Sequence, residues 1–292
     1  MILVAGGTGT LGRHIVRLLV EQGHQVRVLT RERERARDLP GEVEIVTGDV
    51  RTATDVAAAV RGCRTVISAV HGFIGSGNPS PEAIDRDGNR VLMGAAAEAG
   101  VEHLVLMSVH GASPEHPMSL HRAKYAAEQA LQASGLRFTI IRATAFLETW
   151  VTVIGGTLSD QGHALVFGPG RNPINFVSVR DVAAVVALSV QDPSMSNEIV
   201  EIGGPEDLGF VTLAERLVEA SGKPARIKHI PLLMLRVMAV LARPFSPGFA
   251  RQARAAVTMN TTDMTCDAKA LRARFPRLPT TTVEKVLSEL QL

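Results

Sequence analysis

The chain begins with MILVAGGTGTLGR, residues 1–13, and this stretch decides the fold. A short apolar run suited to a buried strand is followed by Gly6, Gly9 and Gly12, and a helical pattern then runs over residues 13–22. Glycine lets the turn bend sharply, lets the backbone approach a ligand without a Cβ, and lets the helix pack closely on the strand. Because the first turn of a helix carries unpaired N–H groups, the stretch predicts a binding site for a pyrophosphate group.

The composition is that of an ordinary globular protein. The 292 residues suffice for one large domain, or for a nucleotide-binding domain with a smaller appended region. The hydrophobic fraction of 46% and the charged fraction of 21% are typical of such domains. The net charge of +2, without a basic stripe, gives no reason to expect a nucleic-acid partner.

Cysteine usage and hydropathy predict a soluble cytoplasmic protein. Cys63 and Cys266 lie far apart, without neighbours at metal-ligand spacing, so we expect reduced thiols and no metal. The longest strongly apolar stretch, residues 231–242, is too short to span a bilayer and contains Arg236. Since Met1 leads directly into the first strand, no signal peptide is expected. We expect a monomer or a homodimer that acts on a small-molecule substrate.

Apolar runs alternate with helical patterns through the first half of the chain. The predicted strands cover residues 2–5, 25–29, 44–47, 65–69, 103–107 and 137–141, and the predicted helices cover 11–22, 52–60, 82–99 and 120–133. Such alternation indicates right-handed βαβ units and an α/β fold with a doubly wound parallel sheet. Ligands of this fold bind beyond the carboxyl ends of the strands.

The rhythm changes after residue 141. Residues 146–174 are predicted to be loop-rich, and further elements are predicted at 175–179 (strand), 181–189 (helix), 198–202 (strand), and 212–221, 231–242, 248–257 and 282–290 (helices). We therefore expect a dinucleotide-binding Rossmann domain of residues 1–145 and 175–203. Residues 146–174 and 204–292 would form a smaller, mainly helical region for substrate or partner.

The glycine loop GGTGTLGR resembles that of the short-chain dehydrogenase/reductase superfamily, in particular its atypical members. These include the NmrA-like proteins, the isoflavone-reductase-like enzymes and the relatives of nucleotide-sugar epimerases. Four further stretches carry the resemblance over about two-thirds of the chain. They are Gly48-Asp49, Ser68-Ala69, DRDGNRVL (residues 85–92) and NFVSVRDVA (residues 175–183).

The resemblance implies a nicotinamide dinucleotide as cofactor. Its predicted contacts come from the glycine loop, from the ends of the next three strands and from one lysine. They are Gly6, Thr8, Gly9, Thr10, Leu11, Gly12, Arg13, Arg31, Asp49, Val50, Ser68, Ala69, Val70 and Lys124.

The end of the second strand favours NADP over NAD. An NAD-binding domain usually ends this strand with Asp or Glu, which binds the ribose 2′-hydroxyl. Here the strand ends in Thr30-Arg31, without a carboxylate. Arg31 can pair with a 2′-phosphate, and Arg13 can assist. The alternative is that Arg31 only begins a solvated charge run, RERERAR, over residues 31–37.

The catalytic pattern lacks one member. Active short-chain reductases carry a tyrosine four residues before a lysine, and a serine at the end of the fifth strand. Ser108 and Lys124 match the serine and the lysine, but Leu120 occupies the position of the tyrosine. Tyr125, the neighbour of Lys124, points about 100° round the helix and is a poor substitute.

His121 is one candidate to replace the tyrosine, and Ser119, His110 and His116, in or near residues 108–121, are others. The alternative for each histidine is a surface or loop residue without function. His121 lies three residues before Lys124 on the same helix face, and histidine titrates near pH 7. The predicted catalytic residues are therefore Lys124, Ser108 and His121. The alternative for Lys124 is an exposed helix lysine loosely paired with Glu128.

Two segments are predicted to line the substrate pocket. They are the glycine- and proline-rich loop 71–81 and the stretch 142–150. The candidate pocket residues are His71, Phe73, His110, Phe146 and Trp150, although such aromatic side chains are more often ordinary core.

The resemblance implies an NADP-dependent oxidoreductase that transfers hydride to a small apolar carbonyl, enone or quinone. The rival interpretation is a non-catalytic NADP(H)-binding sensor, regulator or assembly factor of the NmrA-like type, and Leu120 favours it. Helix 231–242, with Arg243, Arg251 and Arg254 beyond it, is expected to pack over the cleft. The alternative is an amphipathic helix that binds a membrane surface or a partner.

Overall fold

The structure is a computed structural model that describes residues 1–73, 80–222 and 224–289. The chain divides into two compact units, Met1–Arg142 with Val182–Glu201 and Ala143–Asp181 with Ile202–Leu292. Residues 175–181, which the sequence analysis grouped with the nucleotide-binding region, fall in the second unit. Residues 74–79, most of the predicted cleft loop, lie outside the described residues.

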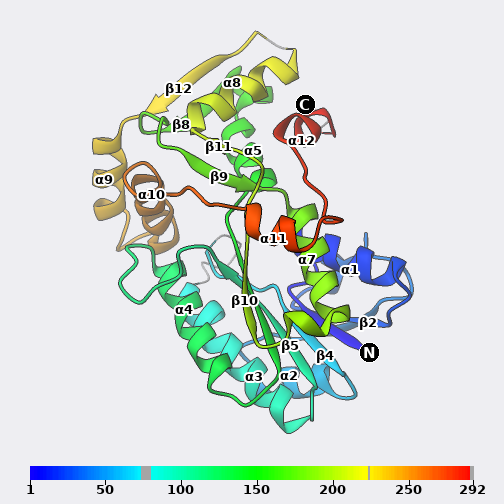
Figure 1. The fold of residues 1–292 in the computed structure, drawn as a ribbon. Helices are drawn as coiled ribbons and strands as arrows, with labels where there is room; N and C mark the ends of the chain where they lie inside the picture. Colours follow the sequence, from blue (N-terminus) through cyan, green and yellow to red (C-terminus); the bar gives the residue numbers. More distant parts are fainter. Residues whose placement is uncertain (74–79, 223, 290–292) are drawn as a thin grey trace. The chain divides into compact units, whose positions relative to one another are not determined.

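A seven-stranded parallel sheet forms the first unit, in the order β10-β6-β5-β4-β1-β2-β3 (Figure 1). Its strands are β1 (Ile2–Ala5), β2 (Val26–Thr30), β3 (Glu44–Thr47), β4 (Thr65–Ser68), β5 (His103–Val109), β6 (Phe138–Ala143) and β10 (Glu198–Ile202). In the register, Ile2 lies beside Val26 of β2 and beside Thr65 of β4. The strand order reverses at β1, as the doubly wound prediction requires, and the predicted strands lie within a residue or two of those observed. The prediction of an α/β fold is confirmed.

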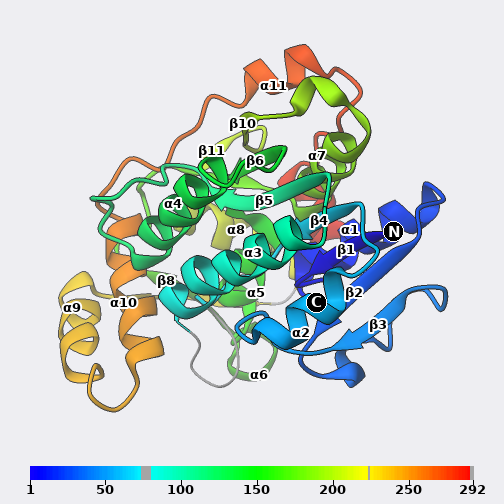
Figure 2. The same cartoon turned by 90° about the horizontal axis from the view of Figure 1, so that it is seen from below.

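Helices cover both faces of this sheet (Figure 2). They are α1 (Thr10–Glu21), α2 (Ala53–Val60), α3 (Asn89–Glu98), α4 (Ser119–Gln132) and α7 (Val179–Gln191), with short turns η1 (Arg33–Ala36) and η3 (Pro193–Met195). Alternate residues of each strand face opposite layers, so Leu3 and Ala5 of β1 pack with buried residues of α2, α3 and α4. The inner strands β1, β4 and β5 are therefore almost wholly buried, whereas the edge strands β3 and β10 keep exposed residues.

The predicted helix 82–99 begins with an unusual turn. Residues Glu82–Gly88 form a π-helix, η2, which continues directly into α3. Such wide turns are rare and are frequently found at functional sites. Here the π-helix carries Asp85, whose contacts are described below.

Two small sheets and several helices form the second unit. The sheets are β11-β9-β7 and β12-β8, with β7 (Ala145–Phe146), β8 (His163–Phe167), β9 (Ile174–Val177), β11 (Asp207–Leu208) and β12 (Arg226–Ile230). The helices are α5 (Leu147–Gly155), α6 (Leu158–Gln161), α8 (Phe210–Ser221), α9 (Leu232–Leu241), α10 (Pro247–Met259), α11 (Lys269–Arg274) and α12 (Val283–Glu289).

The expectation of a loop-rich segment 146–174 is wrong, because this segment holds α5, α6 and β8. Its order comes from burial against distant residues. Trp150 of α5 lies 4.7 Å from the Phe210 ring, and β8 pairs with β12 more than 60 residues later. Among the described residues, no helix is both long and apolar enough to cross a lipid bilayer.

Candidate active site

The glycine loop follows β1 and needs its glycines for close backbone packing. Gly6 has φ +86°, and a Cβ there would lie 2.6 Å from the carbonyl oxygen of Ala69. A Cβ at Gly12 would lie only 2.1 Å from the oxygen of Gly6. The Gly9 N–H donates to that same oxygen at 3.0 Å, and this bond closes the turn before α1.

The N-terminus of α1 fits a diphosphate group. Its first turn carries no acidic residue, and Gly9 and Thr10 are exposed there. A Cβ at Gly9 would meet only the Gly6 oxygen, at 3.4 Å, so the outer side of the loop is open to a ligand. The unpaired N–H groups and the helix dipole favour an anion at this position. Leu11 is buried beneath the loop, which leaves its backbone as the part that can contact a cofactor.

Arg13 holds the loop to the segment after β2. Its Nε donates to the Thr8 oxygen at 3.0 Å, and its Nη2 donates to the Arg35 oxygen at 2.6 Å. An ion pair of 3.1 Å joins its Nη1 to Asp38. Arg31 is exposed directly after β2, and its charge helps to lower the pKa of Asp49. Of the two arginines predicted to bind a 2′-phosphate, Arg31 is the one located at the end of β2.

Asp49 and Val50 follow β3. The guanidinium of Arg51 donates to both oxygens of Asp49, and this hydrogen bonding is the main reason that the Asp49 pKa lies below its usual range. Val50 is buried, and a Cβ on Gly88 of η2 would lie 2.9 Å from its methyl group. Because its pKa is lowered, the Asp49 carboxylate stays ionised at neutral pH.

The end of β4 is joined to α3. The buried Ser68 hydroxyl donates to Asn89 Oδ1 at 2.6 Å, and the Asn89 amide donates to the backbone carbonyl oxygen of Asp85 at 2.7 Å. Ala69 donates its N–H to Ala5 at 2.8 Å, which continues the sheet ladder beside the glycine loop. The buried hydrogen bond from Ser68 thus holds the carboxyl end of β4, which we call the strand exit, against α3.

Lys124 of α4 reaches this strand exit. Its Nζ donates to the Val70 oxygen at 2.9 Å and forms a 2.9 Å ion pair with Asp85 Oδ1. The side chain of Lys124 is 6% exposed and that of Asp85 is fully buried. The other oxygen of Asp85 accepts the Gly72 N–H at 2.8 Å. Lys124 is therefore a buried, compensated cation, and the alternative of an exposed helix lysine paired with Glu128 is wrong.

Asp85 is the main residue that the sequence analysis did not place in the site. It begins the DRDGNRVL stretch that was noted as a family resemblance. In the structure Asp85 pairs with Lys124, Gly88 packs on Val50 and Asn89 binds Ser68. The motif itself was the available signal, because its three matching residues all contact the strand ends around the predicted cofactor site.

Ser108 lies in a different polar cluster. Its hydroxyl donates to Glu128, a fully buried carboxylate of α4. Arg142 donates to both oxygens of Glu128, at 2.9 and 2.7 Å, and burial together with this pairing keeps the carboxylate in place. A second carboxylate, Glu201, lies 3.6 Å from Arg142 and 3.3 Å from His110. The hydroxyl of Ser108 is thus engaged with Glu128, whereas Lys124 is engaged with Asp85.

His121 is buried and 3% exposed. Its ring stacks on that of His116 with centroids 3.7 Å apart, and its Nδ1 has no hydrogen-bond partner among the described residues. Burial, and then the nearby His116 and His110, lower the pKa of His121 to about 3. A ring that stays neutral at pH 7 is a poor proton donor. The geometry therefore gives little support to the predicted acid role.

Acidification is expected to weaken the fold through His121. Its pKa is about 3 when folded and near 6.5 when unfolded, so only the unfolded chain binds this proton between those values. Stability is unaffected above pH 6.5 and falls as the pH drops toward 3, by roughly 1–2 kcal/mol at pH 5. Urea unfolding at pH 7 and pH 5 measures this loss. The His121→Phe variant keeps the stacking and should show a smaller loss; an unchanged pH dependence would contradict the assignment.

The predicted substrate residues are divided between the two units. His71 lies next to Lys124 and Asp85. Desolvation of its imidazole by the surrounding protein lowers the pKa of His71, although part of the residue remains exposed to solvent. Phe73 is half-buried. Phe146 and Trp150 belong to the second unit, where the partly buried Trp150 packs on Phe210 against the core.

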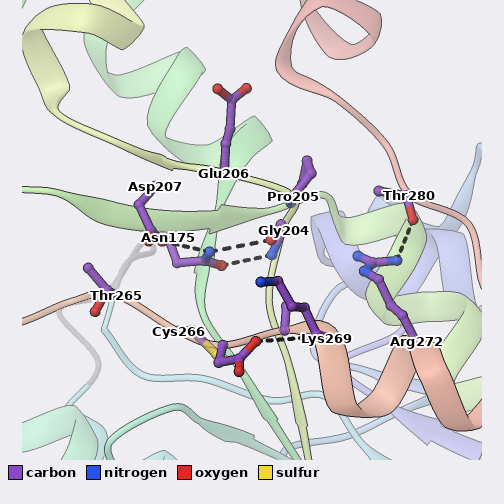
Figure 3. A pocket seen from close by; sticks show the side chains of 12 residues that line it. Asn175, Gly204, Pro205, Glu206, Asp207, Thr265, Cys266, Lys269, Arg272 and Thr280 are labelled. Carbon is purple, nitrogen blue, oxygen red and sulfur yellow. Dashed lines mark hydrogen bonds between the residues drawn. The ribbon is translucent and has the colours of Figure 1, made fainter.

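The second unit has a pocket of about 550 Å³ (Figure 3). Asn175 forms its wall: the amide donates to the Gly204 oxygen at 3.3 Å and to Asp207 at 2.8 Å. Arg272, on the other side, donates to the Thr280 hydroxyl at 2.8 Å. None of the five predicted substrate residues is among the residues that line this pocket.

Comparison with known proteins decides the family. The model of the NAD(P)H-binding protein family matches residues 6–193, which include the glycine loop, Asp85 and Lys124. The chain belongs to the NAD(P)H-binding family. Within it, the chain is an NmrA-like, atypical member of the short-chain dehydrogenase/reductase superfamily, as the sequence predicted. Its Rossmann-type fold is that of an NAD(P)-binding oxidoreductase.

Two related proteins align with most of this chain. An NAD(P)H azoreductase from Xenophilus azovorans is 30% identical over 80% of this chain and 78% of its own length. The photosystem II assembly factor Ycf39 of a Synechocystis strain is 28% identical over 99% of this chain and 90% of its own.

Solved structures confirm the fold. The NADP(H) complex of a Citrobacter triphenylmethane reductase matches with a TM-score of 0.80, at 19% identity over 99% of both chains. The NADPH complex of an Escherichia coli quinone oxidoreductase matches with a TM-score of 0.78, at 21% identity over 99% of both chains.

Proposed function

We propose that this protein is an NADP(H)-dependent reductase that transfers hydride to a small, largely apolar carbonyl, enone or quinone. The observation that carries the proposal is the buried Lys124–Asp85 pair at the exit of β4. The Gly6 backbone approaches Ala69, and the next residue, Val70, accepts from Lys124. A contiguous strip of the first unit therefore joins a diphosphate-binding loop to a fixed cation.

The cation has a definite chemical use. When bound, NADPH supplies the hydride, and the protein supplies position and electrostatics. Reduction places negative charge on the acceptor oxygen, and a cation fixed in a buried site stabilises that charge strongly. The ammonium of Lys124 has three N–H groups, of which one donates to Val70 and one faces Asp85. The third can donate to a ribose hydroxyl or to an acceptor oxygen.

Leu120 narrows the class of acceptor. Its side chain has no proton to give, and we assign the proton to Lys124 or to water. Enolates and hydroquinone anions are weaker bases than simple alkoxides and are therefore satisfied by a weaker proton donor. This favours enones and quinones over simple ketones. The azoreductase relative supports reductive chemistry on a conjugated acceptor.

Arg31 supports the preference for NADP over NAD. It is exposed at the end of β2, and that strand end carries no carboxylate. A charge-assisted hydrogen bond is worth about 1.5–3 kcal/mol, so Arg31→Gln should weaken NADPH binding by about 10- to 100-fold. The affinity for NADH should change little. Equal effects on both nucleotides would contradict the role of Arg31 as a 2′-phosphate ligand.

The experiment that tests the function has two stages. Fluorescence titration with NADPH and NADH measures affinity and preference. Loss of NADPH absorbance is then followed with a panel of quinones, enones and aldehydes. We expect tighter binding of NADPH and oxidation by at least one quinone or enone. Tight binding without oxidation by any acceptor would contradict the reductase proposal.

That same outcome would support a second candidate function. A non-catalytic NADP(H)-binding assembly factor or regulator needs the glycine loop and Lys124 but no proton donor. Leu120 fits this candidate, and so does the similarity to an assembly factor along 99% of the chain. Oxidation of NADPH by an acceptor therefore distinguishes the reductase from the non-catalytic protein.

A further inference from the structure

Helices α9 and α10 form a hairpin in the second unit, side by side in Figure 1. Leu235 and Ala239 of α9 are 2–3% exposed, whereas most of the outer surface of α9 is open to solvent. An ordinary surface helix is apolar inside and polar outside. The outer surface of α9 is apolar as well, which ordinary packing does not explain.

The exposed apolar side chains of the described residues are concentrated here. Seven of the nine large ones belong to residues 233–249: Leu233, Met234, Val237, Val240, Leu241, Phe245 and Phe249. Phe245, in the turn between the helices, is 89% exposed, and Leu233 is 72% exposed. Contiguous apolar surface of this kind marks a site of interaction with another body. We call these seven residues the apolar stripe.

The members of the stripe on α9 lie on one side of the helix. At about 100° per residue, the five members on α9 fall within an arc of about 120°. Leu235 and Ala239 lie on the opposite side of the helix, toward the interior. Arg236 borders the arc, about 40° from Val240. The α9 part of the stripe is therefore one face of the helix, with a cation at its edge.

The chain segment that carries the stripe has charges of one sign. From Ala220 to Thr262 the sequence has no Asp or Glu. It has seven basic residues: Lys223, Arg226, Lys228, Arg236, Arg243, Arg251 and Arg254. The whole chain carries a net charge of only +2, so this segment is a local concentration of positive charge. Arg236, Arg243 and Arg254 are exposed.

We propose that the apolar stripe and its arginines dock the protein on the surface of an anionic lipid bilayer. Apolar side chains that enter the headgroup boundary, flanked by arginines, are the recognised composition of interfacial helices. An aromatic side chain standing out from a turn suits insertion into a fluid surface. A second copy of the chain would bring the same cations face to face, which costs affinity.

The test is flotation of the full-length protein with lipid vesicles. The probes are vesicles of phosphatidylcholine alone and vesicles that also contain phosphatidylglycerol. Binding is expected only with phosphatidylglycerol and should weaken as salt is added, because salt screens the arginines. No binding to either vesicle, or equal binding to both, would overturn the proposal.

Paired variants identify the surface. Leu241→Ser with Phe245→Ser, and separately Arg243→Gln with Arg254→Gln, should each lower binding by about tenfold or more. The matched controls are Val153→Ser with Ile199→Ser, two exposed apolar residues elsewhere, and Arg64→Gln with Arg90→Gln. Equal loss in variants and controls would overturn the proposal. So would a concentration-dependent dimer that Phe245→Ser abolishes, since a second copy would then cover the stripe.

Discussion

Replacing Lys124 by methionine is expected to cost about 3–5 kcal/mol of folding free energy, the typical cost of breaking a buried ion pair. The side chain of Asp85 is fully buried, and without the ammonium its charge is left in the interior. The Gly72 N–H, donated at 2.8 Å, compensates only part of that charge. Urea unfolding at pH 7 measures the loss.

A second substitution distinguishes the effect of the unpaired Asp85 charge on stability from the role of Lys124 in NADPH binding. In Lys124→Met with Asp85→Asn, the uncompensated charge is gone, and asparagine can still accept from Gly72. Much of the lost stability should return. NADPH binding and turnover should remain impaired, because the fixed cation at Val70 is still missing.

The exposed Lys285 provides the matched control. Lys285→Met removes the same charge from the surface and should change stability by less than about 0.5 kcal/mol. If Lys124→Met folds as stably as Lys285→Met, the buried pair is not what holds Lys124. If it folds poorly but the double variant regains full NADPH affinity, the ammonium has no role in binding.

Local pattern predicted the first unit because its inner strands are covered on both faces. A buried parallel strand is a short apolar run bounded by polar turns, and β1, β4 and β5 have this form. The helices between them have a strong 3.6-residue period. Such signals lie within a dozen residues, so the alternation could be recognised from the sequence without knowledge of distant contacts.

The second unit was less predictable because its strands depend on partners far along the chain. β8 pairs with β12, and β9 pairs with β7 and β11. The two-residue strands β7 and β11 have no periodicity to detect. The aromatic side chains that order the unit, such as Trp150 and Phe210, come from separate helices.

The candidate site divides in the same way. The glycine loop, the strand ends and Lys124 follow from the resemblance and the order of elements. The partner of Lys124 does not, because Asp85 is 39 positions away and faces it only through the π-helix η2. Ser108 illustrates the opposite case. It has the expected position on β5, but the carboxylate beside it, Glu128, engages its hydroxyl.

Gly12→Ala is the second substitution with a large expected effect. Alanine is the better helix former by about 1 kcal/mol, so on propensity alone this change within α1 should stabilise the protein. The added Cβ would instead lie 2.1 Å from the Gly6 oxygen and 2.7 Å from the Gly7 Cα. Both atoms are backbone, and the loop must shift to make room. Such overpacking costs about 1–3 kcal/mol or more.

Gly94→Ala is the control that makes the result specific. Gly94 lies within α3, and a Cβ there would meet nothing within 4 Å. This variant should gain about 0.5–1 kcal/mol and bind NADPH as the wild type does. Gly12→Ala should lose stability and also at least about tenfold in NADPH affinity, because the same shift misplaces the N–H groups that bind the diphosphate. Loss of stability with unchanged affinity would show that the loop only packs the helix on the strand. If Gly12→Ala matched Gly94→Ala in both measurements, the close approach of Gly12 to Gly6 would be refuted.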